Sequence, residues 1–307
     1  MRNACLDMIT TLAATDRRVV FVGSDLGPGT MADFQERFPE RFFMEGISEA
    51  AVVGMAAGLA MEGFVPYVNT IATFLTRRAY EQVALDVCMH KVPVRLIGNG
   101  GGLVYAPLGS THMAIEDIAL MRALPNMTVV CPADADEMRR FMALTLDWPD
   151  PIYIRLGKGY DPIVSQPEHG FRIGRAIHYN HGADALLVTT GVTLQEAIAA
   201  ARLLETQGIT AGILHMHTVK PLDAEQFLDL AVKVPVIVSL EEHTTMGGLG
   251  EALAALLAAS GFSPAKRFAG IGIPDRFPDY YGSQQEIMAR FGLTPEKIAG
   301  TVMRLMR

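Results

Sequence analysis

The chain has 307 residues, half of them hydrophobic and 19% charged, and this composition excludes a disordered or fibrous protein. Its formal net charge is −7 without a block of Lys or Arg, which argues against a nucleic-acid-binding protein. The longest nearly uninterrupted apolar stretch, residues 50–61, is far shorter than the roughly 18–20 residues that span a bilayer. The N-terminal residues lack a signal pattern and the three cysteines are scattered, so we expect a soluble cytoplasmic protein without disulfides or a thiolate zinc site.

Short β-rich runs alternate with longer helical patterns along the first half of the chain. Buried strands are predicted at residues 19–22, 65–69, 94–97, 128–131 and 152–156. Helices are predicted at residues 3–14, 49–61, 76–88, 114–123 and 134–146. This alternation is typical of a doubly wound, mostly parallel sheet.

Gly, Pro, Asp, Ser and His replace the apolar pattern at residues 157–172, which indicates a linker between domains. The alternation then restarts, with strands predicted at residues 185–189, 210–216, 234–240 and 268–273, helices at 193–206 and 249–259, and two closing helices. We therefore expect an α/β fold of two doubly wound domains, at residues 1–165 and 177–307, joined by a linker at residues 166–176.

Glu49 begins a predicted helix that is apolar or small on every side and is therefore expected to be buried. Ser48 is a candidate cap, and the helix dipole favours a carboxylate in the first turn, so a capping role is the simpler interpretation. The alternative is a functional carboxylate in an apolar interface, which needs a partner that donates a proton or a charge. That partner need not be part of the protein.

Four further positions each allow a structural and a functional interpretation. Phe74 and Tyr80 lie six residues apart, and at helical spacing aromatic side chains are more often core than cofactor platform. Between them, Arg77 is suited to capping or to binding an anion. His112 follows a glycine-rich loop that fits neither the dinucleotide nor the P-loop pattern, and its role is as easily functional as capping.

Histidines and carboxylates also end two strands of the second half. His215 and His217 would lie on one face of a strand, as in some metal sites, but no third ligand is near in the sequence. A structural role is favoured for this pair, and no metal site is predicted. Glu241, Glu242 and His243 end a strand at the edge where open α/β sheets present functional groups.

Taken in order, these motifs resemble the C-terminal half of transketolase over essentially the whole chain. The matching segments are Gly46-Ile47-Ser48-Glu49, Ala72-Thr73-Phe74-Leu75, Arg78-Ala79-Tyr80-Glu81-Gln82, Ser110-Thr111-His112, Thr218-Val219-Lys220-Pro221 and Glu241-Glu242-His243 with the glycines after them. In that family a pyrimidine-binding domain precedes a smaller C-terminal α/β domain. A further domain carries a Gly-Asp-Gly segment and holds the diphosphate of thiamine diphosphate through Mg²⁺ or Ca²⁺. This sequence contains no Gly-Asp-Gly, so it resembles the small subunit of a split transketolase.

The resemblance implies roles for the residues that would hold the cofactor. Glu49 matches the glutamate that hydrogen-bonds the pyrimidine ring of thiamine diphosphate and promotes its activation. Phe74 matches the aromatic residue that packs on this ring, and Arg77 and Tyr80 lie along the same wall. Asp25 matches an aspartate near the thiazolium. A separate chain of the N-terminal transketolase type would hold the metal and the diphosphate.

The resemblance also implies a substrate side, where the chain departs from the family pattern. His112 matches the histidine that faces the substrate, and Arg2 falls where a family arginine reaches the sugar phosphate. Gly29 replaces a phosphate-binding serine and Lys158 replaces an arginine. The loop at residues 99–108 lacks the histidine and aspartate that contact phosphate and a sugar hydroxyl. We therefore expect an altered anion site, and a sugar substrate of unusual shape or without a terminal phosphate.

The activity implied is a transketolase-type transferase, which moves a two-carbon ketol unit from a ketose or ketose phosphate to an aldose. The resemblance further implies a heterotetramer of two small and two large subunits. One alternative is the β subunit of a 2-oxoacid dehydrogenase or decarboxylase, or a deoxyxylulose-phosphate-synthase-like enzyme. Another is a non-catalytic assembly subunit, against which the presence of Glu49, Phe74 and His112 argues.

Overall fold

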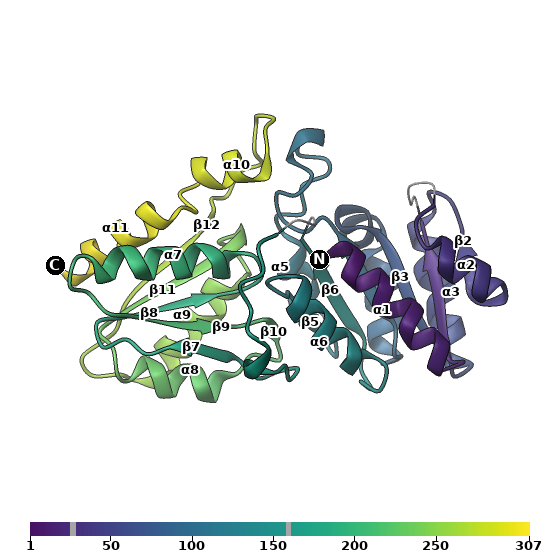
Figure 1. Ribbon diagram of the computed structural model, residues 1–307, viewed down its shortest axis with the longest axis horizontal. Coiled ribbons are helices and arrows are strands. Elements are labelled where there is room, and N and C mark those ends of the chain that lie inside the picture. Colours follow the sequence, from purple (N-terminus) through teal and green to yellow (C-terminus); the bar gives the residue numbers. More distant parts are fainter. Residues whose placement is uncertain (25–28, 158–160) are drawn as a thin grey trace.

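The computed structural model describes residues 1–24, 29–157 and 161–307, and within these ranges the chain forms two α/β units side by side (Figure 1). The strands are β1 (Val19–Gly23), β2 (Phe42–Met44), β3 (Val65–Ile71), β4 (Arg95–Asn99), β5 (Thr128–Val130), β6 (Ile152–Leu156), β7 (Ile177–Asn180), β8 (Ala185–Thr189), β9 (Ala211–His215), β10 (Thr218–Lys220), β11 (Val236–Thr244) and β12 (Arg267–Ile273). The α-helices are α1 (Arg2–Thr15), α2 (Ala32–Arg37), α3 (Glu49–Met61), α4 (Tyr80–Gln82), α5 (Asp117–Ala123), α6 (Ala135–Thr145), α7 (Thr193–Glu205), α8 (Ala224–Ala231), α9 (Leu249–Ser260), α10 (Gln284–Arg290) and α11 (Pro295–Met306).

The first sheet has the strand order β10-β5-β6-β4-β3-β1-β2 and is parallel except at its β10 edge. Its central strands are buried along almost their whole length, because helices cover both faces, as is usual for parallel sheets. Helices α1 and α6 pack together on one face. The other face is covered by α3, by α5 and by the segment that follows α4. The predicted doubly wound, mostly parallel sheet is confirmed.

The second sheet has the order β12-β11-β8-β9-β7 and is parallel except at its β7 edge. Its two apolar cores lie on opposite faces, one under α7 and α11 and the other under α8 and α9. Strand β10, which follows β9 directly, leaves this sheet and pairs antiparallel with β5 of the first one. The two units are therefore joined by main-chain hydrogen bonds as well as by side chains.

Two predicted helices differ from the observed elements. The helix predicted at residues 76–88 consists of two π-helical segments, η2 (Phe74–Arg78) and η3 (Val83–Met89), on either side of α4. The helix predicted at residues 114–123 begins only at Asp117, because the preceding residues pair with the glycine-rich loop. Segments of π-helix are rare and occur most often at functional sites.

Crossing a membrane would require a long, continuously apolar helix. Among the described residues no helix has both the length and the hydropathy to do so.

Candidate active site

Three of the predicted site residues, Glu49, Phe74 and His112, lie on segments that meet at the carboxyl edge of the first sheet. Strands β1 to β4 are parallel, so the segments that follow them meet at this edge. Glu49 opens the helix after β2, Phe74 follows β3, and His112 lies in the long loop after β4. Ligands of open α/β sheets bind at this edge, which makes it the candidate active site.

Glu49 is fully buried in the first turn of α3, and its carboxylate is held from two sides. The guanidinium of Arg78 donates to Oε2 at 2.6 Å. The hydroxyl of Ser24, which donates to the carbonyl of Gly46 at 2.6 Å, also lies 3.3 Å from Oε1. The predicted capping role of Ser48 is wrong, because its hydroxyl donates instead to the carbonyl of Glu45 at 2.6 Å. Glu49 is thus a buried carboxylate with one ion-pair partner, and that partner, Arg78, is 47% exposed.

A chain of ring contacts links Glu49 to His112. The Arg78 guanidinium lies over the Phe74 ring, 4.5 Å from its centroid. Phe74 in turn meets His112 edge to face, with ring centroids 5.3 Å apart. Nδ1 of His112 bonds the hydroxyl of Thr111 at 2.9 Å. The structure therefore brings together Glu49, Phe74 and His112, which the sequence motifs indicate, and adds Arg78.

Arg77 and Tyr80 make contacts within the chain. Arg77 forms a bidentate ion pair with Glu116 and donates to the carbonyl of Met113 at 3.0 Å. The Tyr80 hydroxyl donates to the carbonyl of Leu120 at 3.2 Å, and its ring packs against the apolar core. These contacts hold η2 and α4 against the region around α5. The predicted cofactor contacts of Arg77 and Tyr80 stay predictions.

Four buried polar atoms at the same edge of the sheet have no hydrogen-bond partner within the described part of the chain. They lie at the ends of β3 and β4 or just after β3, and they are Nδ2 of Asn69, Oγ1 of Thr70, Oγ1 of Thr73 and Oδ1 of Asn99. Leaving such a group buried and unpaired costs about 1–3 kcal/mol. A site that accepts this cost is suited to a polar ligand or to ordered water.

Arg2 lines a separate groove between α1 and α2. The groove has a volume of about 670 Å³ and contains Gly29, Thr30 and Arg37 in addition to Arg2. Arg2 and Gly29, two positions of the predicted anion site, therefore share one cavity, whereas His112, a further described position, does not line it. Asp25 and Lys158 lie outside the described residues, so their predicted roles stay predictions.

Buried charged groups join the two units behind the site. Arg155 in β6 forms a bidentate ion pair with Asp117 and also donates to the main-chain carbonyl of Glu242 at 2.9 Å. His243 accepts the Ala119 N–H with Nε2 and bonds the carbonyl of Thr244 with Nδ1, and burial lowers its pKa to about 4. Burial also raises the pKa of Glu242 to about 7. Of the residues that the sequence places at this strand end, Glu242 and His243 thus serve the junction between the units.

His215 and His217 are fully buried at the same junction. His215 Nε2 bonds Glu137 of α6 at 3.1 Å, and the His217 ring stacks on Phe171 with centroids 3.8 Å apart. Within the residues that the structure describes, no cluster of three or more His, Cys, Asp or Glu is arranged to hold a metal ion.

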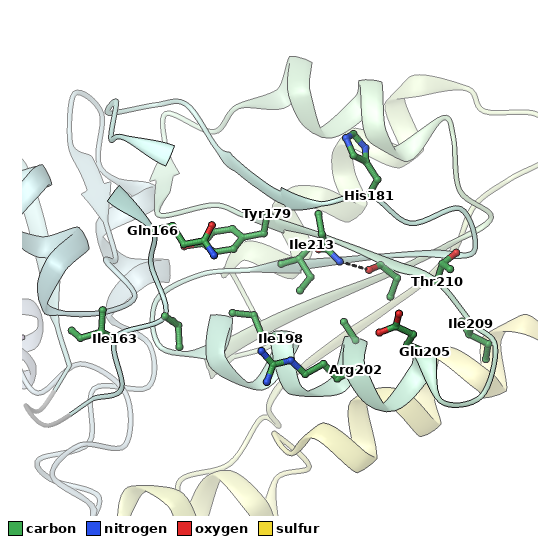
Figure 2. Close-up of a pocket in the computed structure, with 14 residues that line it drawn as sticks. Ile163, Gln166, Tyr179, His181, Ile198, Arg202, Glu205, Ile209, Thr210 and Ile213 are labelled. Atoms are coloured by element: carbon green, nitrogen blue, oxygen red, sulfur yellow. Dashed lines mark hydrogen bonds between the residues drawn. The ribbon is translucent and has the colours of Figure 1, made fainter. Parts of the chain in front are cut away.

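A second cavity lies in the second unit. It has a volume of about 470 Å³ and lies between α7 and the β7 edge of the sheet, with Tyr179, Arg202 and Thr210 on its walls (Figure 2). The cavity contains none of the predicted site residues, so we do not assign the activity to it.

Both units match families of known proteins. Residues 1–160 match the transketolase pyrimidine-binding domain, and residues 174–298 match the transketolase C-terminal domain. A solved structure described as a split gene transketolase, inactive β4 tetramer, superimposes with a TM-score of 0.91 at 34% identity, over 99% of this chain and 97% of that chain.

Curated relatives show similarity of two kinds. The chain is 34% identical to one subunit of the apulose-4-phosphate transketolase of Phocaeicola vulgatus, over 100% of this chain and 97% of the relative. It is 33% identical to one subunit of the 6-deoxy-6-sulfo-D-fructose transketolase of a Clostridium species, over 97% and 92%. It is also 36% identical to 1-deoxy-D-xylulose-5-phosphate synthase of Syntrophotalea carbinolica, but it spans only 47% of that protein.

Proposed function

This chain belongs to the transketolase family, and on that premise we propose that it is one subunit of a two-chain transketolase. In this proposal the chain contributes the pyrimidine-binding domain, residues 1–165, and the C-terminal domain, residues 177–307. The reaction is transfer of a two-carbon ketol unit from a ketose to an aldose. The observation that carries the proposal is the fully buried Glu49 at the carboxyl edge of the sheet, linked through Arg78 and Phe74 to His112.

The site fits the pyrimidine half of thiamine diphosphate. Glu49 would hydrogen-bond the ring through its carboxyl group, Phe74 would pack against the ring, and the unpaired buried atoms of Asn69 and Asn99 offer polar contacts nearby. When bound, the cofactor supplies a carbon nucleophile for the ketose carbonyl. The divalent cation and the diphosphate would be held by the partner chain, because this sequence lacks the Gly-Asp-Gly segment.

The site residues of this chain would then have different roles. Glu49 holds or releases a proton at its carboxyl group, and Arg78 and Ser24 fix the position of that group. The ion pair with Arg78 offsets the charge of a carboxylate removed from water. His112 uses Nδ1 to bond Thr111, so Nε2 is the nitrogen left to serve the substrate as a hydrogen-bond donor or acceptor.

An exposed apolar face beside the site fits a partner chain. Helix α3 is buried on one face only, although its sequence is apolar on every side, and Met61 at its end is 52% exposed. Ile47, Leu85 and Met89 are also exposed large apolar side chains, the latter two on η3, which packs against α3. We propose that the partner covers this face, which would complete the burial expected for α3 and close the site.

The groove between α1 and α2 supports a substrate with an anionic far end. Arg2 provides a forked donor, and Gly29 offers no hydroxyl beside it. A phosphate that loses one charged hydrogen bond binds less tightly by roughly 1.5–3 kcal/mol. We therefore propose a sugar of unusual shape, or one whose terminal group is not a phosphate. The names of two relatives, which mention apulose 4-phosphate and a sulfonated fructose, agree with this direction.

Reconstitution with a partner tests the proposed function. The isolated chain should be inactive and should bind thiamine diphosphate weakly, whereas the complex with a chain that carries Gly-Asp-Gly should bind it with Mg²⁺ and transfer a ketol unit. Calorimetry and a coupled sugar assay measure both. Micromolar, Mg²⁺-dependent binding to the isolated chain would contradict the division of the site between two chains.

The similarity to 1-deoxy-D-xylulose-5-phosphate synthases supports a second candidate, a synthase-like enzyme that consumes pyruvate and releases carbon dioxide. The reconstituted complex distinguishes the two activities. Release of carbon dioxide from pyruvate, without ketol transfer between sugars, would favour the synthase-like reaction.

A further inference from the structure

The loop that carries His112 is closed at its base by main-chain hydrogen bonds. Gly102 donates to the carbonyl of Ala114 at 2.9 Å, and Ala114 donates back to the carbonyl of Gly102 at 3.0 Å. The segment between them, which we call the 102–114 loop, therefore starts and ends at one point. His112 lies two residues before the end of the loop, so the position of the base determines where its ring meets Phe74.

Glu242, in the second sheet, accepts a hydrogen bond from the base of this loop. It lies in β11 and is 2% exposed, and its Oε1 accepts the Leu103 N–H at 2.9 Å and the side-chain amide of Gln284 at 2.8 Å. Gly102 has a φ of +67°, and a Cβ there would lie 2.5 Å from the carboxyl carbon of Glu242. A side chain at position 102 would therefore collide with Glu242, and a glycine there lets the loop come this close.

Arg155 ties the other end of the loop to the same strand. Its Nη2 donates to the main-chain carbonyls of Glu242 at 2.9 Å and of Ala114 at 3.2 Å. Its Nε donates to Asp117 at 2.8 Å, at the start of α5. Both ends of the 102–114 loop are thus bonded to the Glu242 residue, one directly and one through Arg155.

The underside of the loop rests on the second unit as well. Its apolar residues form one buried cluster with residues of the C-terminal region, namely Leu103, Ala106, Met113 and Ile115 with Ile273, Ile287, Met288 and Leu293. The Ser110 hydroxyl donates to the carbonyl of Pro278. The cluster supports the loop, and among the described residues only Glu242 bonds its base with a side chain from the second sheet.

We infer that Glu242 is a positioning residue, which fixes the base of the 102–114 loop from the second unit and thereby holds His112 against Phe74 at the site. The activity part of this inference rests on the proposed function, whereas its structural part does not. It gives the C-terminal unit a role in the reaction, although none of its side chains is assigned to the cofactor or the substrate.

The test compares Glu242→Ala with a control at the adjacent residue, Glu241→Ala, first in the chain alone, where the result does not depend on the proposed function, and then in the reconstituted two-chain complex. Glu241 is equally buried in β11, but its carboxylate accepts the N–H groups of Leu249 and Gly250 within the second unit. Hydrogen exchange of the 102–114 peptides is measured first. Glu242→Ala should speed their exchange at least tenfold, and Glu241→Ala should leave it close to wild type. Equal exchange in Glu242→Ala and wild type would overturn the inference, even if the proposed activity is wrong.

Ketol transfer then tests the connection to His112. Glu242→Ala should lower kcat/KM by roughly ten- to hundredfold, the scale expected when a catalytic group is displaced by about 1 Å. In a His112→Ala background the same change should cost less than about twofold, because the group that Glu242 positions is already gone. Glu242→Gln, which keeps an acceptor for the Leu103 N–H, should recover most of the activity. A loss that multiplies with that of His112→Ala would refute positioning through His112.

Discussion

At the scale of single residues, the site depends on a carboxylate that is expensive to bury. Glu49 has no exposed surface, and its charged partner Arg78 reaches it from 29 residues further along the chain. Because Arg78 is half exposed, it stays hydrated when the carboxylate is neutralised, so removing the charge of Glu49 leaves no uncompensated charge in the interior. A residue kept in this position without structural need is best explained by its chemistry toward a ligand.

Glu49→Gln separates this chemistry from structure. The amide keeps the shape of the side chain and an acceptor for Ser24, but it cannot take up or release the proton. We expect turnover of the reconstituted complex to fall by about 10²–10⁴, with little change in its melting temperature. Steady-state ketol transfer and calorimetric unfolding measure the two quantities.

The matched control is Glu45→Gln, which changes an exposed glutamate just before the same helix. This variant should keep wild-type turnover. If Glu49→Gln retained more than about a tenth of wild-type turnover, which lies well outside the expected range, the role assigned to Glu49 would be wrong.

At the scale of elements, the sequence is most informative where strands are buried on both faces. Residues 152–156 and 185–189 are short, mostly apolar runs, and the pattern predicts both strands with the observed bounds. The short edge strands β2, β7 and β10 are not predicted, because three or four residues carry too little pattern. Apolar periodicity predicts a helix at residues 76–88, but it does not distinguish π-helical turns from α-helical ones.

Local sequence patterns also predict only part of the candidate site. Glu49 stands out because a carboxylate on an apolar helix is conspicuous in the sequence, and Phe74 and His112 because the family motifs contain them. Sequence patterns do not predict the Glu49–Arg78 ion pair or the hydrogen bond from the Leu103 N–H to Glu242, since both join residues that are distant in sequence. Such pairings are set by the packing of the sheet, which no local pattern encodes.

Two glycines provide a test of packing within elements. Gly98 lies in the buried strand β4, and a Cβ there would lie 2.5 Å from the Tyr153 hydroxyl, which donates to Asp117 at 2.7 Å. Gly98→Ala should therefore destabilise the chain by about 1–3 kcal/mol. Gly58 lies on the exposed face of α3 with no atom near its missing Cβ, so Gly58→Ala should stabilise by about 0.5–1 kcal/mol.

Urea unfolding of the isolated chain measures both glycine variants. Equal midpoints for Gly98→Ala and wild type would show that Tyr153 moves aside without cost, and the close contact would then carry no structural weight.

At the scale of the whole molecule, buried titratable groups hold the two units together. Glu137 of α6 bonds His215 of β9, and this contact together with the bond to the Ala133 N–H holds the Glu137 pKa near 2. His217 is buried beside them, and its pKa is lowered to about 4, chiefly by burial. Unlike His215, His217 has no hydrogen-bond partner at Nε2 within the described residues. The stability of this junction is therefore expected to depend on pH.

The sign of that dependence follows from the direction of each pKa shift. A histidine whose pKa is lowered on folding contributes fully above its unfolded value of 6.5, and the contribution is lost as the pH falls toward 4. Glu137, whose pKa is also lowered, changes its contribution only below 4.5. Glu241 and Glu242, with pKa values raised to about 7, oppose the histidine, since they lose stability as the pH rises from 4.5. A comparison of variants therefore has to isolate the histidine from the two glutamates.

His217→Phe isolates it, because the glutamates are present in both proteins and a phenyl ring preserves stacking on Phe171. Between about pH 7.5 and pH 5, wild type should lose about 2 kcal/mol of unfolding free energy relative to the variant. This figure corresponds to about 1.36 kcal/mol for each pH unit below the unfolded pKa of 6.5. His90→Phe, at an exposed histidine, should run parallel to wild type. Urea unfolding at half-unit steps of pH measures the three curves. Parallel curves for wild type and His217→Phe would mean that His217 takes up its proton in the folded protein as readily as in the unfolded chain, because the junction opens to water before the protein unfolds.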